Sequence, residues 1–285
     1  MKILVTGSNG QLGNELRLVL PQDMAGVPLL FADKNELDLT DAAAVKRYLE
    51  DYEVTHIVNC AAYTAVDKAE EDKALCAAVN VDAVKNLAVA ADSLGAKIIH
   101  ISTDYVFDGK TWRPYRESDK VNPCSHYGTT KRLGETALLA LAPDSIIVRT
   151  SWLYSPFGQN FVKKMIELGR QSSDIRVVSD QIGSPTYAAD LAWAIACILK
   201  SPQWVQGIYH FANEGVCSWY DFARVTLWLA GIKDCHITPI PTEDWPTAAA
   251  RPSFSVLDKS RIRLTYGVKT PNWIDSLQDC INRLK

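Results

Sequence analysis

The sequence lacks the cysteine and histidine patterns of disulfide-bonded and metal-binding proteins. Its seven cysteines are an odd number, spread from Cys60 to Cys280, and no two of them form a CxxC pair. A secreted disulfide framework is therefore not expected, and reduced thiols in a cytoplasmic protein fit better. The five histidines stand apart from one another and from the cysteines, so we expect no metal site among them.

Blocks of positive charge and long apolar runs are also missing. The formal net charge is −3, and no basic cluster suited to a phosphate backbone is present, so nucleic acid is not an expected partner. The longest apolar run, residues 191–199, suits a buried helix rather than a membrane span. Because the apolar start of the chain is too short for a signal peptide, we expect neither export nor a membrane partner.

What the sequence does have is a regular alternation of apolar runs and helical patterns. The apolar, β-branched runs lie at residues 2–7, 28–33, 56–63, 97–103 and 145–154. Strands that are apolar throughout are typical of a parallel sheet covered on both faces. The pattern predicts an α/β fold, a doubly wound parallel sheet of the Rossmann-like kind.

The alternation weakens after about residue 150. Residues 207–213 still suit one more strand of the sheet, but aromatic and proline-rich pieces follow. We therefore expect residues 1–150, with about 176–212, to form a dinucleotide-binding Rossmann domain. Residues from about 151–175, with 213–285, are expected to form a smaller C-terminal substrate-binding subdomain.

The stretch TGSNGQLG places Gly7, Gly10 and Gly13 between the first predicted strand and the first predicted helix. Glycines there allow a tight turn and close approach of the backbone to a pyrophosphate, which the helix N-terminus then attracts. This context predicts a dinucleotide site.

Asp33 ends the second predicted strand, about 20 residues beyond Gly13. A carboxylate there can accept hydrogen bonds from the adenosine ribose and favours NADH, whereas the adjacent Lys34 suits a 2′-phosphate and favours NADPH. Both cofactors remain open, as does a simple turn-capping role for Asp33.

A candidate catalytic group follows the fourth predicted strand. Thr103 and Asp104 emerge at its carboxyl end, and Tyr127 and Lys131 lie one turn apart on the next predicted helix. Reduction of a ketone needs a hydride from the cofactor and a proton on oxygen. We expect Tyr127 to supply that proton, with Lys131 lowering its pKa and holding the nicotinamide ribose, and Thr103 donating to the substrate oxygen.

These motifs resemble those of the extended short-chain dehydrogenase/reductases, and finer signatures resemble one branch, the dTDP-4-dehydrorhamnose reductases. The matching stretches cover essentially the whole chain: TGSNGQLG (6–13), AAYTAVDKAE (61–70), STDYVFDG (102–109), YGTTK (127–131), RTSWLY (149–154), QIGSPTYAADLA (181–192) and RPSFSVLD (251–258). The resemblance implies reduction, by NADPH or NADH, of the 4-keto group of a dTDP-sugar, giving dTDP-L-rhamnose.

The resemblance also implies roles for further residues. Around the cofactor these are Gly10, Gln11 and Leu12 at the pyrophosphate, Asp38 and Leu39 at the adenine, and Ala61, Ala62 and Tyr63 along its length. For the sugar nucleotide they are Thr103, Asp104, Trp152 and Arg251. Other readings stay open: a turn cap for Asp104, a core position for Trp152, a purely structural link for Arg251, and either a supporting or a surface role for Asn80.

Two other functions fit parts of this pattern. One is a nucleotide-sugar dehydratase or epimerase, although Tyr105 stands where a 4,6-dehydratase typically carries a glutamate. The other is a non-catalytic NADP-binding module, like the regulatory beta subunit of methionine adenosyltransferase. Some members of the resembled branch form dimers bridged by magnesium. Glu15 is present here, but only Asp190 remains of the second acidic cluster, so we expect a monomer or homodimer and the pattern argues against a metal bridge.

Overall fold

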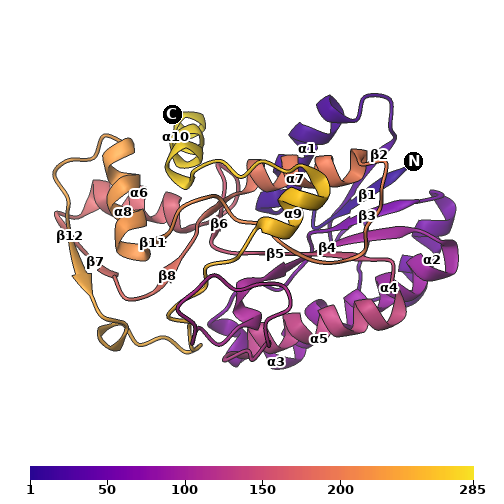
Figure 1. The fold of residues 1–285 in the computed structure, drawn as a ribbon, viewed down its shortest axis with the longest axis horizontal. Helices are drawn as coiled ribbons and strands as arrows, with labels where there is room; N and C mark the ends of the chain where they lie inside the picture. The colour runs from indigo at the N-terminus through magenta and orange to yellow at the C-terminus, as the bar shows by residue number, and fades with distance from the viewer.

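A computed structural model describes all 285 residues of the chain, 1–285. The larger of its two lobes is built on a six-stranded parallel sheet with the order β10-β5-β4-β3-β1-β2 (Figure 1). Its strands are β1 (Ile3–Thr6), β2 (Leu29–Ala32), β3 (His56–Asn59), β4 (Lys97–Thr103), β5 (Ile146–Thr150) and β10 (Gly207–His210). The predicted doubly wound α/β fold is confirmed, and residues 207–210 join the sheet as predicted.

Helices cover both faces of this sheet (Figure 1). They are α1 (Gln11–Asp23), α2 (Ala42–Asp51), α3 (Lys73–Ala77), α4 (Ala83–Leu94), α5 (His126–Leu141), α7 (Ala188–Lys200) and α9 (Ser260–Tyr266), with the short turns η1 (Lys68–Glu70), η2 (Ala78–Asp82) and η3 (Asp104–Val106). Helices α1 and α7 pack on one face, and α2, α4 and α5 pack on the other. Successive residues of each strand point to opposite faces of the sheet, so they pack alternately into the two cores.

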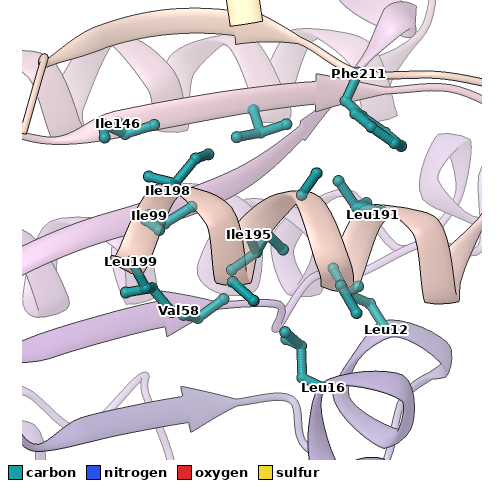
Figure 2. Close-up of a cluster of buried hydrophobic side chains, with 14 of the residues drawn as sticks. Leu12, Leu16, Val58, Ile99, Ile146, Leu191, Ile195, Ile198, Leu199 and Phe211 are labelled. Carbon is teal, nitrogen blue, oxygen red and sulfur yellow. The ribbon is translucent and has the colours of Figure 1, made fainter. Parts of the chain in front are cut away.

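Helix α7 is the centre of the first core. Ile195, Ile198 and Leu199 point from it toward strand residues such as Ile99 and Ile146, and helix α1 packs alongside (Figure 2). The run that begins at residue 191 is thus a buried helix, as its composition predicted.

The smaller lobe contains short paired strands and three helices. Its elements are β6 (Leu153–Tyr154), α6 (Phe161–Gln171), β7 (Asp174–Val178), β8 (Ile182–Gly183), β9 (Thr186–Tyr187), β11 (Cys217–Ser218), α8 (Trp219–Leu229), β12 (His236–Ile240), η4 (Thr242–Asp244) and α10 (Trp273–Leu284). Strand β7 pairs with β12 and β8 pairs with β11. Both strands within residues 174–183 therefore belong to the smaller lobe. From the sequence, residues from about 176 onward were expected in the larger lobe. We propose that the chain returns to the larger lobe at α7.

The helical segment Lys73–Leu94 is, by length and composition, apolar enough to cross a membrane, and half of that window is buried in the fold. Its α4 part contributes Val84, Leu87 and Ala91 to the core beneath the sheet. The apolar character of this segment is therefore used in packing.

The core around α7 predicts a large effect of one truncation. Ile195 is fully buried, so Ile195→Ala should lower the free energy of unfolding by about 2–5 kcal/mol through lost contacts and a residual cavity. Chemical denaturation measures this. In the control Leu264→Ala, a side chain that is 86% exposed is removed, and a change within about 0.5 kcal/mol is expected. Equal effects of the two variants would contradict this description of the core.

Candidate active site

An open cleft of about 900 Å³ lies at the carboxyl ends of the sheet strands, between the two lobes. Ligands of doubly wound folds bind at this edge. All of the predicted site residues except Tyr63 and Arg251 line the cleft: Gly7, Gly10, Gln11, Leu12, Gly13, Asp33, Asp38, Leu39, Ala61, Ala62, Thr103, Asp104, Tyr127, Lys131 and Trp152.

The glycine-rich loop at one end of the cleft has no room for side chains. Gly7 has a φ of +61°, and a Cβ there would lie 2.7 Å from the backbone nitrogen of Ala61. A Cβ on Gly13 would lie 2.5 Å from the carbonyl oxygen of Gly7, so α1 packs directly on the loop. The N-terminus of α1 has neither a side-chain cap nor an acidic residue in its first turn. Its free N–H groups suit the pyrophosphate of a dinucleotide.

The next part of the cleft lies beyond β2. The Asp33 carboxylate accepts hydrogen bonds from the backbone N–H groups of Asn9 (3.1 Å) and Lys34 (2.7 Å), which ties it to the glycine loop. The Lys34 side chain is exposed, lines the cleft and pairs with no carboxylate. A hydrogen bond from the Thr40 hydroxyl lowers the pKa of the nearby Asp38 carboxyl.

Helix α5 brings Tyr127 and Lys131 to the wall of the cleft. The Ser125 hydroxyl caps this helix by accepting the N–H of Gly128 (3.1 Å), and the Glu70 carboxylate accepts the N–H of His126 (2.7 Å). Both caps fix where the first turn of α5 begins. Tyr127 and Lys131 then lie one turn apart and are only 8% and 2% exposed.

Burial holds Tyr127 in its protonated form. Burial raises the pKa of its hydroxyl above the usual value, and contact with the Thr103 hydroxyl offsets part of this effect. Lys131, which was expected to lower this pKa, is not among the groups that shift it. The Lys131 Nζ instead donates to the carbonyl oxygen of Ile101 at 2.7 Å, and burial lowers its pKa to about 8.

Asp104 is a buried carboxyl beside this pair. Its Oδ1 accepts from the Thr103 hydroxyl at 3.1 Å, whereas its Oδ2 has no hydrogen-bond partner. Burial raises the pKa of Asp104 to about 6, against the lowering effect of the Ser255 and Thr103 hydroxyls. An unpaired, buried oxygen on the wall of the cleft is suited to a hydrogen bond from a sugar hydroxyl.

Asn80 lies in a π-helical turn, η2, in the middle of the α3–α4 segment. Its side chain accepts the N–H of Tyr63 (2.9 Å), donates to the Tyr63 carbonyl oxygen (3.2 Å) and donates to Thr130 (3.2 Å). Asn80 is therefore not a surface residue, and it fixes the loop after β3 to helix α5. The Tyr63 hydroxyl donates to Asp72, which takes its ring away from the cleft.

Trp152 forms the boundary between the two lobes. Its φ of +47° is unusual for a bulky residue and breaks the predicted strand 145–154 into β5 and β6. The indole stacks on Trp219 of the smaller lobe, with ring centres 3.6 Å apart, and it also lines the cleft. The sequence left open whether Trp152 packs in the core or lines the site, and its side chain does both.

Arg251 does not point into the cleft. Its Nη2 donates to the Asp67 carboxylate at 2.7 Å, and its Nη1 donates to the Tyr105 hydroxyl at 3.3 Å. The backbone N–H of Ala249 also donates to Asp67 (3.2 Å). These contacts join the segment after η4 to the loop after β3, which is the linking role that the sequence left open for Arg251.

The Glu15 carboxylate also forms its contacts within the chain. It is 1% exposed, accepts the Ser155 hydroxyl at 2.9 Å and pairs with the Arg283 guanidinium at 2.9–3.0 Å. Arg283 belongs to the C-terminal helix α10. The Arg283 guanidinium is therefore paired with the Glu15 carboxylate, which the resemblance had associated with a magnesium bridge.

The sequence did not single out the loop that closes the cleft from the smaller lobe. Gly158, Gln159 and Asn160 line the cleft, and Asn160 Nδ2 donates to Gln11 Oε1 at 2.9 Å. The Asn160 side chain also caps α6 by accepting the N–H of Lys163. A glycine with an asparagine two residues later, just before a helical pattern, is the signal that marks this turn.

The chain is similar to known proteins along its whole length. The family model described as the RmlD substrate binding domain matches residues 1–285. The chain belongs to this family. A relative in Bacillus subtilis (strain 168), the spore coat polysaccharide biosynthesis protein SpsK, is 40% identical over 98% of this chain and 96% of its own length.

Two solved structures of dTDP-4-dehydrorhamnose reductases are similar to the whole chain of this RmlD-family protein. One, from Clostridium acetobutylicum, is 45% identical with a TM-score of 0.95 and covers 100% of this chain and 99% of its own. The other, from Bacillus anthracis in complex with NADP, is 39% identical with a TM-score of 0.94 and covers 99% of this chain and 100% of its own.

The environment of Asp104 predicts a pH-dependent effect in this RmlD-family protein. Because the folded-state pKa is raised from 3.8 to about 6, the folded protein gains stability from protonated Asp104 at low pH and loses it as the pH rises through about 6. Asp104→Asn removes this loss. It should raise the free energy of unfolding relative to the native protein by about 1–3 kcal/mol at about pH 8, and by little at about pH 4. Urea denaturation at both pH values tests this, and a pH-independent difference would contradict it.

Proposed function

We propose that this chain reduces the 4-keto group of dTDP-4-dehydro-L-rhamnose with NADPH or NADH and releases dTDP-L-rhamnose. The observation that carries the proposal is the cleft itself. A glycine cradle lies at one end, and Thr103, Tyr127 and Lys131 converge at the other. The activity named for the two similar reductase structures, one of them holding NADP, supports the same reading.

The chain's own residues bind and orient the cofactor. The free N–H groups of α1 receive the pyrophosphate, with Gly7 and Gly13 leaving room for its approach. Ala61, Ala62 and Leu39 also line the cleft, where the rest of the cofactor would lie. When bound, the nicotinamide cofactor supplies the hydride.

Tyr127 supplies the proton to the substrate oxygen. Its raised pKa keeps the hydroxyl protonated at neutral pH, so the donor is ready before substrate binds. Lys131 has a pKa of about 8 and can hold or release a proton near neutral pH, so we assign it to stabilising and reprotonating the tyrosine oxygen. The Thr103 hydroxyl, which donates to Asp104 Oδ1, turns to donate to the same substrate oxygen and holds it in place.

The sugar nucleotide occupies the interlobe part of the cleft. Asp104 Oδ2 is the free acceptor there for a sugar hydroxyl, and the Trp152 indole offers an apolar face. Arg251 reaches the substrate only if its pair with Asp67 opens, so we assign it first to joining the lobes. Tyr105 lines the cleft where a dehydratase would need a carboxylate, and this favours reduction over dehydration.

The proposal extends to the setting of the enzyme. All seven cysteines are free, which suits reducing conditions in the cytoplasm. Because Glu15 is paired with Arg283, we propose a monomer or a homodimer without a metal bridge. No nucleic acid or membrane partner is proposed.

The assay that tests the function is the loss of nicotinamide absorbance with dTDP-4-dehydro-L-rhamnose, run in parallel with NADPH and NADH. Tyr127→Phe should lower kcat by about 10²- to 10⁴-fold, because the proton donor is removed while the ring stays in place. Cofactor affinity, followed by fluorescence, should stay within about twofold, since the phenol does not carry the binding. Native turnover in this variant would overturn the role of Tyr127, and no turnover by the native protein would overturn the function.

The choice of cofactor gives a second test. The exposed Lys34 side chain is the free cation beside Asp33, so it is placed to meet a 2′-phosphate. Lys34→Gln should weaken NADPH binding about tenfold, the value of one partly exposed charge-assisted hydrogen bond, and leave NADH nearly unchanged. An equal loss of affinity for both cofactors would show that Lys34 does not bind the 2′-phosphate.

A further inference from the structure

Three neighbouring strands carry a row of buried polar side chains below the cleft. Thr6 of β1, Asn59 of β3 and His100 of β4 are direct register partners, and each is at most 2% exposed. The preceding positions on the same face, such as Leu4 and Ile57, belong to the apolar core. Buried polar groups in such a position are costly unless they bond to one another.

The direction of the hydrogen bonds in this row is fixed at one end. The backbone N–H of Ala61 can only donate, and it donates to Asn59 Oδ1 at 3.1 Å. The Thr6 hydroxyl donates to the same oxygen at 2.8 Å. The amide of Asn59 therefore turns its Nδ2 toward His100, 3.0 Å from Nδ1.

That contact determines the tautomer of His100. An amide NH₂ is only a donor, so Nδ1 must be the unprotonated acceptor and the ring proton lies on Nε2. The ring cannot become an imidazolium without losing the bond to Asn59. Burial also disfavours the imidazolium, because it lowers the pKa of His100 well below the usual value. His100 Nε2 lies 3.4 Å from Lys131 Nζ.

We propose that His100 is a positioning residue for Lys131: held by Asn59 as the Nε2–H tautomer, it presents a hydrogen-bond donor to Nζ and thereby favours the neutral amine. An N–H group pointing at an ammonium repels it, whereas the same group bonds to the lone pair of an amine. With Ile101 accepting on another side, Nζ is held by one donor and one acceptor.

Burial already lowers the pKa of Lys131, and the other groups that face Nζ do not add to this lowering. Glu135, one turn along α5, raises the pKa of Lys131, but its carboxylate is bound by Arg149 at 2.8 Å and by Arg132 at 3.0 Å. The thiol of Cys60, beyond β3, is kept protonated because burial raises its pKa. The Cys76 thiol of α3 lies 3.2 Å from the Thr130 hydroxyl. Tyr127 is protonated, as described above. His100 is thus the group that places an N–H donor against Nζ.

The consequence for turnover rests on the proposed function. A lysine with its ordinary pKa would remain charged and would return its proton slowly to the tyrosine oxygen after each reduction. A lysine poised near the working pH both stabilises that oxygen and reprotonates it, because proton transfer is most efficient when the pKa values are close to the pH. The polar row thus links three strands of the sheet to the proton supply of the reaction.

The first test does not depend on turnover. In protein labelled with ¹⁵N-histidine, nitrogen NMR should show His100 as the neutral Nε2–H tautomer throughout the pH range of stability, with His100→Gln identifying the signal. Asn59→Asp replaces the donor by an acceptor, so the ring proton should move to Nδ1. A protonated Nδ1 in the native protein, or a ring that titrates near the ordinary histidine pKa, would overturn the proposal.

The second test follows Lys131 itself. In His100→Gln the new amide can turn its oxygen toward Nζ, so the pKa of Lys131, read from its ¹³Cε shift, should rise by about one unit, as expected for one buried hydrogen bond. The pKa that describes the loss of kcat at high pH should rise by the same amount, because the reaction requires the protonated form of Lys131. The matched control His210→Gln changes another fully buried histidine, on β10, whose Nδ1 contacts the Tyr115 carbonyl oxygen. It should leave both values unchanged.

These measurements separate the inference from the proposed function. If the native protein does not reduce the sugar nucleotide, the ring tautomer and the Lys131 titration still support or overturn the role of His100. If the reductase is active but His100→Gln leaves both the Lys131 pKa and the pKa for the loss of kcat at high pH unchanged, His100 is only a packing residue and the inference is wrong.

Discussion

The burial of one amine, Lys131 Nζ, is the constraint on which the site depends. An amine that is almost fully removed from water needs polar partners at defined positions, because an unpaired charge in the interior is very costly. The partners come from strand β4, which supplies the Ile101 carbonyl oxygen and the His100 ring. Helix α5 must therefore pack on β4 in a single register, and the same register delivers Tyr127 to the edge of the sheet beside Thr103.

The parallel sheet explains why residues so far apart in the chain meet here. Right-handed crossovers place every carboxyl end on one edge, so the loops after β1, β3, β4 and β5 all open into one cleft. The smaller lobe then closes that edge. Its contacts with the larger lobe are specific polar ones, namely Asn160 with Gln11, Arg251 with Asp67 and Arg283 with Glu15. The Trp152 stack on Trp219 adds an apolar contact at the same boundary.

The sequence predicted the parts of this protein that local patterns encode. Apolar strands alternating with helices predicted the sheet, and the glycine loop and the Tyr127–Lys131 spacing predicted both ends of the cleft, because each depends on a few consecutive residues. The sequence could not predict pairings between distant segments. Three such features are the bond between Asn160 and Gln11, the pairing of β7 with β12 and the row from Thr6 to His100. All of them depend on which distant segments become neighbours in the fold.

The features that depart from ordinary packing lie along the same edge of the sheet. Asp104 keeps one buried oxygen unpaired, Lys131 buries an amine, and Trp152 holds a left-handed backbone conformation. Each has a cost in stability that the apolar cores on both faces of the sheet must offset. Strain and unpaired polar groups persist only where the surrounding structure enforces them, and here the enforcing structure is the sheet register together with the interlobe contacts. The shape of the cleft therefore follows from contacts within the chain, which hold these side chains in place.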